Sequence, residues 1–199
     1  MAHTDRVARL RIELADFNPR IWRRIEVPLA LGLNGLHEAI QAAMLFEDYH
    51  LFQFDVGGQR YAIPDPDWDD VRSTIDARNV NLGTLIDRGV TTFKYTYDFG
   101  DDWRHAITIE AVVPADPAHD YPRFVDGAGR APPEDVGGIP GFEEFLEAMT
   151  KPRHPGRKRL IRWYGREFDP DDIDAATITA RLAKLARRHV RHKQVGSTH

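Results

Sequence analysis

The feature that constrains the fold most is the alternation of apolar and polar residues in the first thirty positions. In residues 8 to 14, every second residue is alanine, leucine or isoleucine, and charged residues lie between them. This period of two is typical of a strand with one buried face. After the turn signal Asn18-Pro19, the segment "RIWRRIEVP" repeats the same period, so we predict an antiparallel hairpin.

The rest of the chain places strands first and helices last. An apolar stripe of helical period follows at residues 33 to 43, and residues 49 to 64 have the pattern of a second hairpin that turns at Gly57-Gly58. Further strands are expected at 91–98 and 103–113, and helical periods dominate after residue 141. This order predicts an α+β fold with a mainly antiparallel sheet, an early helix packed on it and C-terminal helices.

The length of the chain fits one domain. With 199 residues, of which 42% are hydrophobic, it can bury one substantial core. We therefore expect a single domain over residues 1–199. Its expected parts are a sheet-rich core at 6–113, a Pro/Gly-rich wrapping loop at 114–141 and a helical part at 142–193.

Composition excludes several classes of enzyme. The chain has no cysteine, and its only serines, Ser73 and Ser197, lie in no catalytic serine motif, so serine and thiol enzymes are disfavoured. No Gly-rich phosphate loop precedes a helix, so we expect no nucleotide cofactor. Because the sequence has neither a long apolar run nor a secretory leader, we expect a cytoplasmic protein that does not contact a membrane.

Charge is distributed unevenly along the chain. Residues 29–150 carry a net charge of −14, whereas residues 151–199 carry +8. The basic end is suited to bind a polyanion, or to pair with the acidic middle of the same molecule. The expected partner is therefore a protein or a nucleic acid. The candidate binding residues are Arg23, Arg24, Trp103, Arg157, Lys158, Arg159 and Arg162.

The segment "YTYDFGDDWRHAITIE" (95–110) concentrates residues that can perform acid/base or metal chemistry. Within eight residues it holds Asp98, Asp101, Asp102 and His105. In a structural interpretation, Gly100 supplies an unusual dihedral angle at a turn and Asp98 or Asp101 accepts backbone N–H groups. His105 then belongs to a buried apolar row of the second strand. We favour this interpretation, because tight turns commonly select aspartate and glycine.

In the alternative interpretation, the hairpin is a metal or acid/base site. Two carboxylates and an imidazole are adequate for metal-assisted hydrolysis. The catalytic candidates are Asp98, Asp101, Asp102 and His105, and the metal-ligand candidates are His37, His50, Asp101 and His105. No other cofactor is predicted. The loop "DPDWDD" is a poor calcium site, because Asp70 occupies the glycine position of an EF-hand and Pro66 stiffens the loop.

Four segments, in this order and spacing, resemble the plasmid pRiA4b ORF-3-like family. They are "NPRIWRRIEVP", "LHEAIQAAMLFEDYHLFQF", "YTYDFGDDWRHAITIE" and "RAPPEDVGGIPGFEEFL", and they cover nearly the whole chain. The resemblance implies a protein of plasmids or insertion elements, some of whose relatives are labelled as resolvases. Two positions depart from the family pattern, because Phe52 replaces a histidine and Phe124 replaces a cysteine. Both changes remove potential metal ligands.

The residues do not support the resolvase label. Neither serine lies in a basic active site, and "RRHVRH" lacks the spaced arginine, histidine and tyrosine of a tyrosine recombinase. We therefore favour a non-catalytic binding or accessory module of plasmids or insertion elements. The alternative is a metal-dependent hydrolase or nuclease that uses the acidic YDFGDDWRH hairpin.

Overall fold

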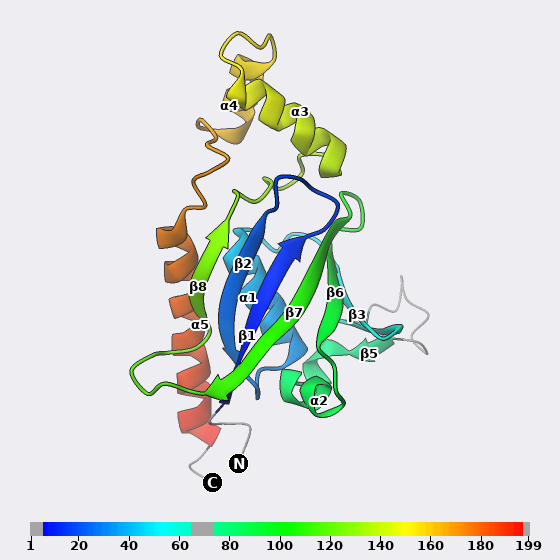
Figure 1. The fold of residues 1–199 in the computed structure, drawn as a ribbon, viewed down its shortest axis with the longest axis vertical. Coiled ribbons are helices and arrows are strands. Elements are labelled where there is room, and N and C mark those ends of the chain that lie inside the picture. Colours follow the sequence, from blue (N-terminus) through cyan, green and yellow to red (C-terminus); the bar gives the residue numbers. More distant parts are fainter. Residues whose placement is uncertain (1–5, 65–73, 197–199) are drawn as a thin grey trace.

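The computed structural model of the chain describes residues 6–64 and 74–196, with side chains up to residue 188. The predicted α+β fold is confirmed: one eight-stranded sheet has the order β5-β4-β3-β6-β7-β1-β2-β8 (Figure 1). Neighbouring strands are antiparallel, except that β4 and β5 are parallel. The strands are β1 (Arg6–Leu14), β2 (Trp22–Pro28), β3 (Phe52–Val56), β4 (Gln59–Ala62), β5 (Thr74–Asp76), β6 (Thr92–Tyr97), β7 (Trp103–Pro114) and β8 (Arg123–Ala128).

Helices cover one face of this sheet. α1 lies behind the sheet in Figure 1, and α5 runs beside β8 and contacts α1. α3 and α4 project beyond one end of the sheet (Figure 1). None of the described helices is long and apolar enough to cross a membrane. The helices are α1 (Leu33–Met44), α2 (Leu82–Asp87), α3 (Gly138–Thr150), α4 (Arg157–Tyr164), α5 (Ala175–Gly196) and the short 3-10 helix η2 (Ala77–Asn79).

The hairpin predicted from the first alternating segments occurs as β1 and β2. β1 pairs with β2 on one side and with β7 on the other. Leu10, Ile12 and Ile25 are fully buried under the helices, while the opposite face carries ion pairs such as those of Glu26 with Arg9 and Arg123, each 2.7 Å long. The period of two therefore sorts the apolar residues to the core and most charged residues to the open face, with Arg23 of β2 as a buried exception.

The segment 114–141, which we expected to be an irregular loop, contains an edge strand. β8 pairs with β2, from Trp22 opposite Ala128 to Glu26 opposite Arg123. A Cβ atom at Gly127 would lie 2.8 Å from the carbonyl oxygen of Trp22, so close approach of the two strands requires glycine there. The many proline and glycine residues of the segment interrupt the alternation that would otherwise have predicted this strand. α3 also begins inside the segment, at Gly138.

Three connecting segments meet at the end of the sheet where α3 begins. They are residues 45–51 between α1 and β3, the turn 98–102 between β6 and β7, and residues 129–137 between β8 and α3. The pairing of β3 with β6 places the first two segments side by side. The third reaches the turn at Gly138, where a Cβ atom would lie 2.8 Å from the carbonyl oxygen of Asp101.

Candidate metal centre

The two carboxylate oxygens of Asp98 have different partners: Oδ1 binds the turn and Oδ2 faces His50. The residue directly follows β6 and has a positive φ of 54°. Its Oδ1 accepts hydrogen bonds from the backbone N–H groups of Gly100 (2.9 Å) and Asp101 (3.3 Å), as the structural interpretation of the turn predicted. Its Oδ2 accepts no hydrogen bond from any described residue and lies 3.6 Å from Nε2 of His50. The side chain is only 9% exposed, so the carboxylate as a whole is largely shielded from solvent.

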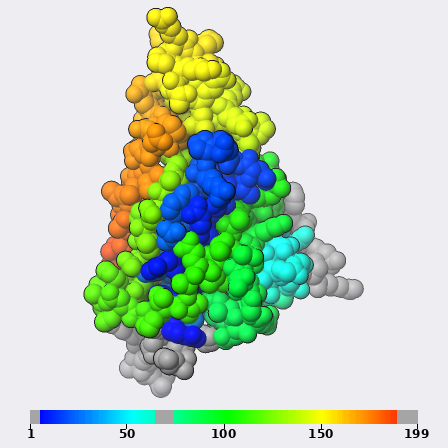
Figure 2. All heavy atoms as spheres, viewed as in Figure 1, coloured from blue at the N-terminus to red at the C-terminus, as the bar shows by residue number. Residues whose placement is uncertain are grey.

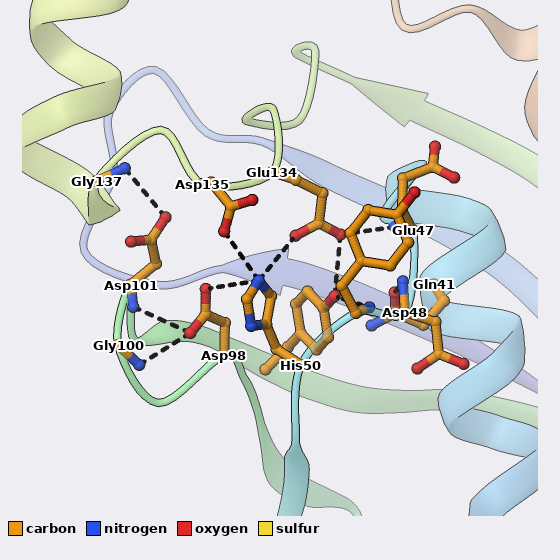
Figure 3. A network of polar contacts seen from close by, with 12 residues as sticks. Gln41, Glu47, Asp48, His50, Asp98, Gly100, Asp101, Glu134, Asp135 and Gly137 are labelled. Carbon is orange, nitrogen blue, oxygen red and sulfur yellow. Dashed lines mark hydrogen bonds and ion pairs between the residues drawn. The ribbon is translucent and has the colours of Figure 1, made fainter.

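His50 is the point on which the carboxylates converge. It belongs to the segment between α1 and β3, and its Nε2 lies 2.9 Å from Oδ1 of Asp135 and 4.0 Å from Oε2 of Glu134. Figure 3 shows the carboxylates of Asp98, Glu134 and Asp135 directed at this nitrogen. One ligand atom each from His50, Asp98 and Asp135 lies within 4.8 Å of the others. Three segments distant in the sequence therefore form one cluster, which we call the His50 cluster (His50, Asp98, Glu134 and Asp135).

Glu134 is the member of the His50 cluster that has a buried carboxylate oxygen without a hydrogen-bond partner in the described part of the chain. Its Oε1 accepts hydrogen bonds from the hydroxyl of Tyr97 (2.9 Å) and the backbone N–H of Glu47 (2.6 Å). Its Oε2 is buried and has no hydrogen-bond partner among the described residues. Burial is the largest influence on this carboxyl and raises its pKa. A carboxylate oxygen that is buried without a donor is a costly arrangement unless a cation or proton accompanies it.

Tyr97 holds Glu134 in place from the core side of the cluster. The phenol accepts a hydrogen bond from the backbone N–H of Tyr49 (2.9 Å) while it donates to Glu134. Burial, together with the hydrogen bond to Glu134, raises the pKa of the phenol. Tyr97 therefore stays protonated and acts as a donor at every ordinary pH.

The other predicted site residues of the hairpin lie away from the His50 cluster. Oδ2 of Asp101 accepts a hydrogen bond from the backbone N–H of Gly137 (3.1 Å) and so fastens the turn to the start of α3. Asp102 is exposed and pairs with Arg104 at 3.1 Å. His105 is buried in the core, where its Nδ1 lies 3.0 Å from the carbonyl oxygen of Trp103. Burial lowers the pKa of His105 to about 4.

His37 also has a structural place. Its Nδ1 lies 2.8 Å from the hydroxyl of Tyr95, and its Nε2 lies 2.8 Å from Oδ1 of Asp48. Burial lowers the pKa of this imidazole. The ring stacks on Phe52 with 3.6 Å between ring centroids, so the phenylalanine at the position of the family histidine packs in the core. Of the four predicted metal ligands, only His50 reaches the cluster.

The predicted binding residues divide into buried and exposed groups. Arg23 and Trp103 are fully buried, so neither can contact a partner at the surface. Arg24 lies on the open face of the sheet and pairs with Glu110 at 2.6 Å. Arg157 is bound within the helical part, to the carbonyl oxygen of Met149 and to Glu167. The members that remain exposed on α4 are Lys158, Arg159 and Arg162.

Two members of the His50 cluster escaped the sequence prediction. Glu134 and Asp135 lie in the segment that we expected to be an irregular loop, and nothing in its local pattern marks a site. A signal was present, however, because both lie in "RAPPEDVGGIPGFEEFL", one of the four family-like segments. The aspartate-rich loop considered for calcium, residues 65–70, lies outside the described residues.

The fold and the cluster define an α+β protein that brings one histidine and three carboxylates together at one end of a single-layered sheet. The family model of the plasmid pRiA4b ORF-3-like protein matches residues 6–177, and the chain belongs to this family. It is 37% identical to the uncharacterized protein y4hQ of Sinorhizobium fredii, over 92% of this chain and 97% of that protein.

A solved structure has the same fold. The crystal structure of a protein of unknown function, MM3350 from Methanosarcina mazei Go1, matches with a TM-score of 0.79 and 32% sequence identity. The match covers 88% of this chain and 97% of that one. Neither relative's name states an activity, so the function must be argued from the site itself.

Proposed function

We propose that the protein binds one divalent metal ion in the His50 cluster, with His50, Asp98 and Asp135 as ligands. The observation that supports this most is the convergence of one ligand atom from each of these three residues within 4.8 Å. Metal bonds of about 2.1 Å place two ligands of a tetrahedral ion roughly 3.4 Å apart. The distances from Nε2 of His50 to Oδ1 of Asp135 (2.9 Å) and to Oδ2 of Asp98 (3.6 Å) lie on either side of that value.

The ligand set favours Mn²⁺ or Zn²⁺. Carboxylates suit Mn²⁺, imidazole suits Zn²⁺, and the chain offers no thiolate that would select a softer ion. The side chain of Asp135 is 64% exposed, so the site opens to solvent on this side. Three protein ligands and an open position are typical of catalytic rather than structural zinc sites.

The chemistry that this arrangement supports is hydrolysis. A bound metal lowers the pKa of its water, and Glu134 is placed to take the released proton because its free Oε2 lies 4.0 Å from Nε2 of His50. We therefore place the metal-dependent hydrolase above the accessory module that the sequence favoured. An accessory module of plasmids or insertion elements remains the alternative, and metal binding without any turnover would favour it.

Metal binding is tested by titrating chelator-treated protein with Mn²⁺ and with Zn²⁺ in a calorimeter. We expect one site per chain, and the replacement Asp98→Asn to weaken binding by at least about tenfold, since even outer-shell partners contribute about 10–100-fold. Asparagine tolerates the positive φ of this position, so the turn is retained. Failure of the wild-type protein to bind either ion would refute the proposal.

Asp102→Asn is the matched control for this titration. Asp102 lies in the same turn, also has a positive φ (56°) and carries the same charge, but it is exposed and outside the His50 cluster. It should bind metal as the wild type does. Equal losses in the two variants would mean that general charge, and not coordination by Asp98, attracts the ion.

A further inference from the structure

One face of α4 combines cations with an exposed aromatic ring. Residues at positions i, i+1, i+4 and i+5 of a helix lie on one side, and these positions are occupied by Lys158, Arg159, Arg162 and Trp163. All four are exposed, and Trp163 is 48% exposed. We call this surface the α4 face. An edge-to-face contact with Phe145, at 5.9 Å between centroids, holds the tryptophan ring in a defined orientation.

Two of the three cations of the α4 face have no ion pair in the described part of the molecule. No described carboxylate lies within 4.0 Å of Lys158 or Arg162, and the nearest to Arg159 is Glu144 at 4.0 Å. This contrasts with the open face of the sheet, where Arg9, Arg24 and Arg123 all have short ion pairs. The α4 face therefore has the charge and the aromatic surface that complement a polyanion with flat rings.

A hollow connects the α4 face with the His50 cluster. It lies between α3 and α4, has a volume of about 260 Å³, and its lining includes Asp135 and Glu144 as well as Arg159 and Trp163. Figure 2 shows that the residues of α3 and α4, in yellow, form a tip that stands out from the rest of the molecule. The volume is below the roughly 300–1,000 Å³ of pockets that enclose a whole drug-sized ligand. The hollow suits one unit of a longer molecule that continues over the α4 face.

We propose that the α4 face binds single-stranded nucleic acid and directs one nucleotide into the hollow beside Asp135. Trp163 stacks on a base, and Lys158, Arg159 and Arg162 contact the phosphates. A single strand is preferred over a duplex because the faces of its bases are accessible to the tryptophan ring. A poly-glutamate chain would satisfy the cations, but it has no flat ring to cover Trp163.

Cleavage of this strand rests on the proposed metal centre, whereas binding to the α4 face does not. In the hydrolytic step, a water oxygen forms a bond to phosphorus and its proton passes to Glu134. One phosphorus–oxygen ester bond breaks, and the departing oxygen takes a proton from solvent. The reaction needs no oxidant or reductant, only water and the divalent ion.

Binding is tested by fluorescence anisotropy with a labelled single-stranded DNA of about twelve nucleotides, at low salt and with chelator present. We expect Trp163→Ala to weaken binding by about fivefold or more, because stacking contributes about 1–3 kcal/mol per base, with each 1.4 kcal/mol a factor of ten. Trp163→Phe should restore much of the loss. The double variant Lys158→Gln/Arg162→Gln should reduce the slope of log affinity against log salt by about 1.4, since each phosphate contact contributes roughly 0.7.

Arg88→Gln is the control, because Arg88 is an exposed cation beside α2, far from α4 (Figure 1). It should bind the strand as the wild type does. Unchanged binding in Trp163→Ala would overturn the proposal, and so would equal competition by duplex DNA or by poly-glutamate. The latter result would assign the α4 face to an acidic protein.

Adding Mn²⁺ to the same complex separates this inference from the proposed function. We expect the labelled strand to shorten with the wild type, and Asp98→Asn to bind the strand normally but leave it intact. If the strand binds and no metal binds, the proposed function fails and the inference stands. If metal binds and the strand does not, the inference fails alone.

Discussion

We expect the replacement Arg23→Met to lower the free energy of unfolding by about 3–5 kcal/mol, which is among the largest effects of a single substitution. Arg23 is fully buried. Its guanidinium donates to the backbone carbonyl oxygens of Ala43 (3.0 Å), Ala128 (3.1 Å) and Gly129 (2.8 Å), as well as to that of Trp22 (2.8 Å). It thereby joins α1, β2 and the segment after β8. Burial, followed by repulsion from Arg130, lowers its pKa to about 10, so the side chain stays charged at neutral pH.

The loss arises because methionine fills the space but donates no hydrogen bond. Each buried carbonyl left without its donor costs about 1–3 kcal/mol, partly offset by removal of a buried charge. Urea unfolding at pH 7 measures the difference. Arg24→Met is the control one residue away. Arg24 pairs with Glu110 on the open face, and we expect a loss of at most about 1 kcal/mol. Equal losses in the two variants would contradict the structural role of Arg23.

The second large effect is the dependence of stability on pH that His105 confers. Burial lowers the folded-state pKa of His105 to about 4, whereas an unfolded histidine titrates near about 6.5. Between these values the unfolded chain binds the proton and the folded protein does not. The contribution of the neutral His105 to the free energy of unfolding is therefore complete above about pH 6.5 and is lost as the pH falls towards 4. The loss amounts to about 3 kcal/mol over this window.

Replacement of His105 by methionine, a residue of similar size without a titrating group, should remove this part of the pH dependence. The measurement is urea unfolding at several pH values from 7 to 4, with the wild type and the variant compared at each pH. The stability of the wild type should fall faster than that of His105→Met by about 3 kcal/mol in total. His119→Gln, at an exposed position, is the control, and its stability should change with pH as that of the wild type does. Parallel curves for wild type and His105→Met would show that the buried imidazole does not couple protonation to unfolding.

The sequence by itself determined most elements of this fold and the faces that they bury, although it did not reveal β5 or β8. Alternation in β1 and β2 assigned Leu10, Ile12 and Ile25 to the core. The alternation in β7 assigned His105 to a buried row of that strand. These are local properties, because each side chain of a strand points to the face opposite that of its neighbours. The tight turn at Asp98 was equally visible, since the residue types themselves select that backbone.

Only the tertiary structure decided which chemical groups meet. His50 and Asp98 are 48 positions apart in the chain, and they adjoin because β3 pairs with β6 so that Phe52 lies opposite Tyr97. Glu134 and Asp135 join them because the chain leaves β8 at one edge of the sheet and returns to the turn of β6 and β7 before α3 starts. No local pattern records strand order or the path of a connection between elements. The three aspartates of the turn therefore look alike in the sequence. They differ only in what the fold places beside them: Asp98 faces His50, whereas Asp101 and Asp102 have structural partners.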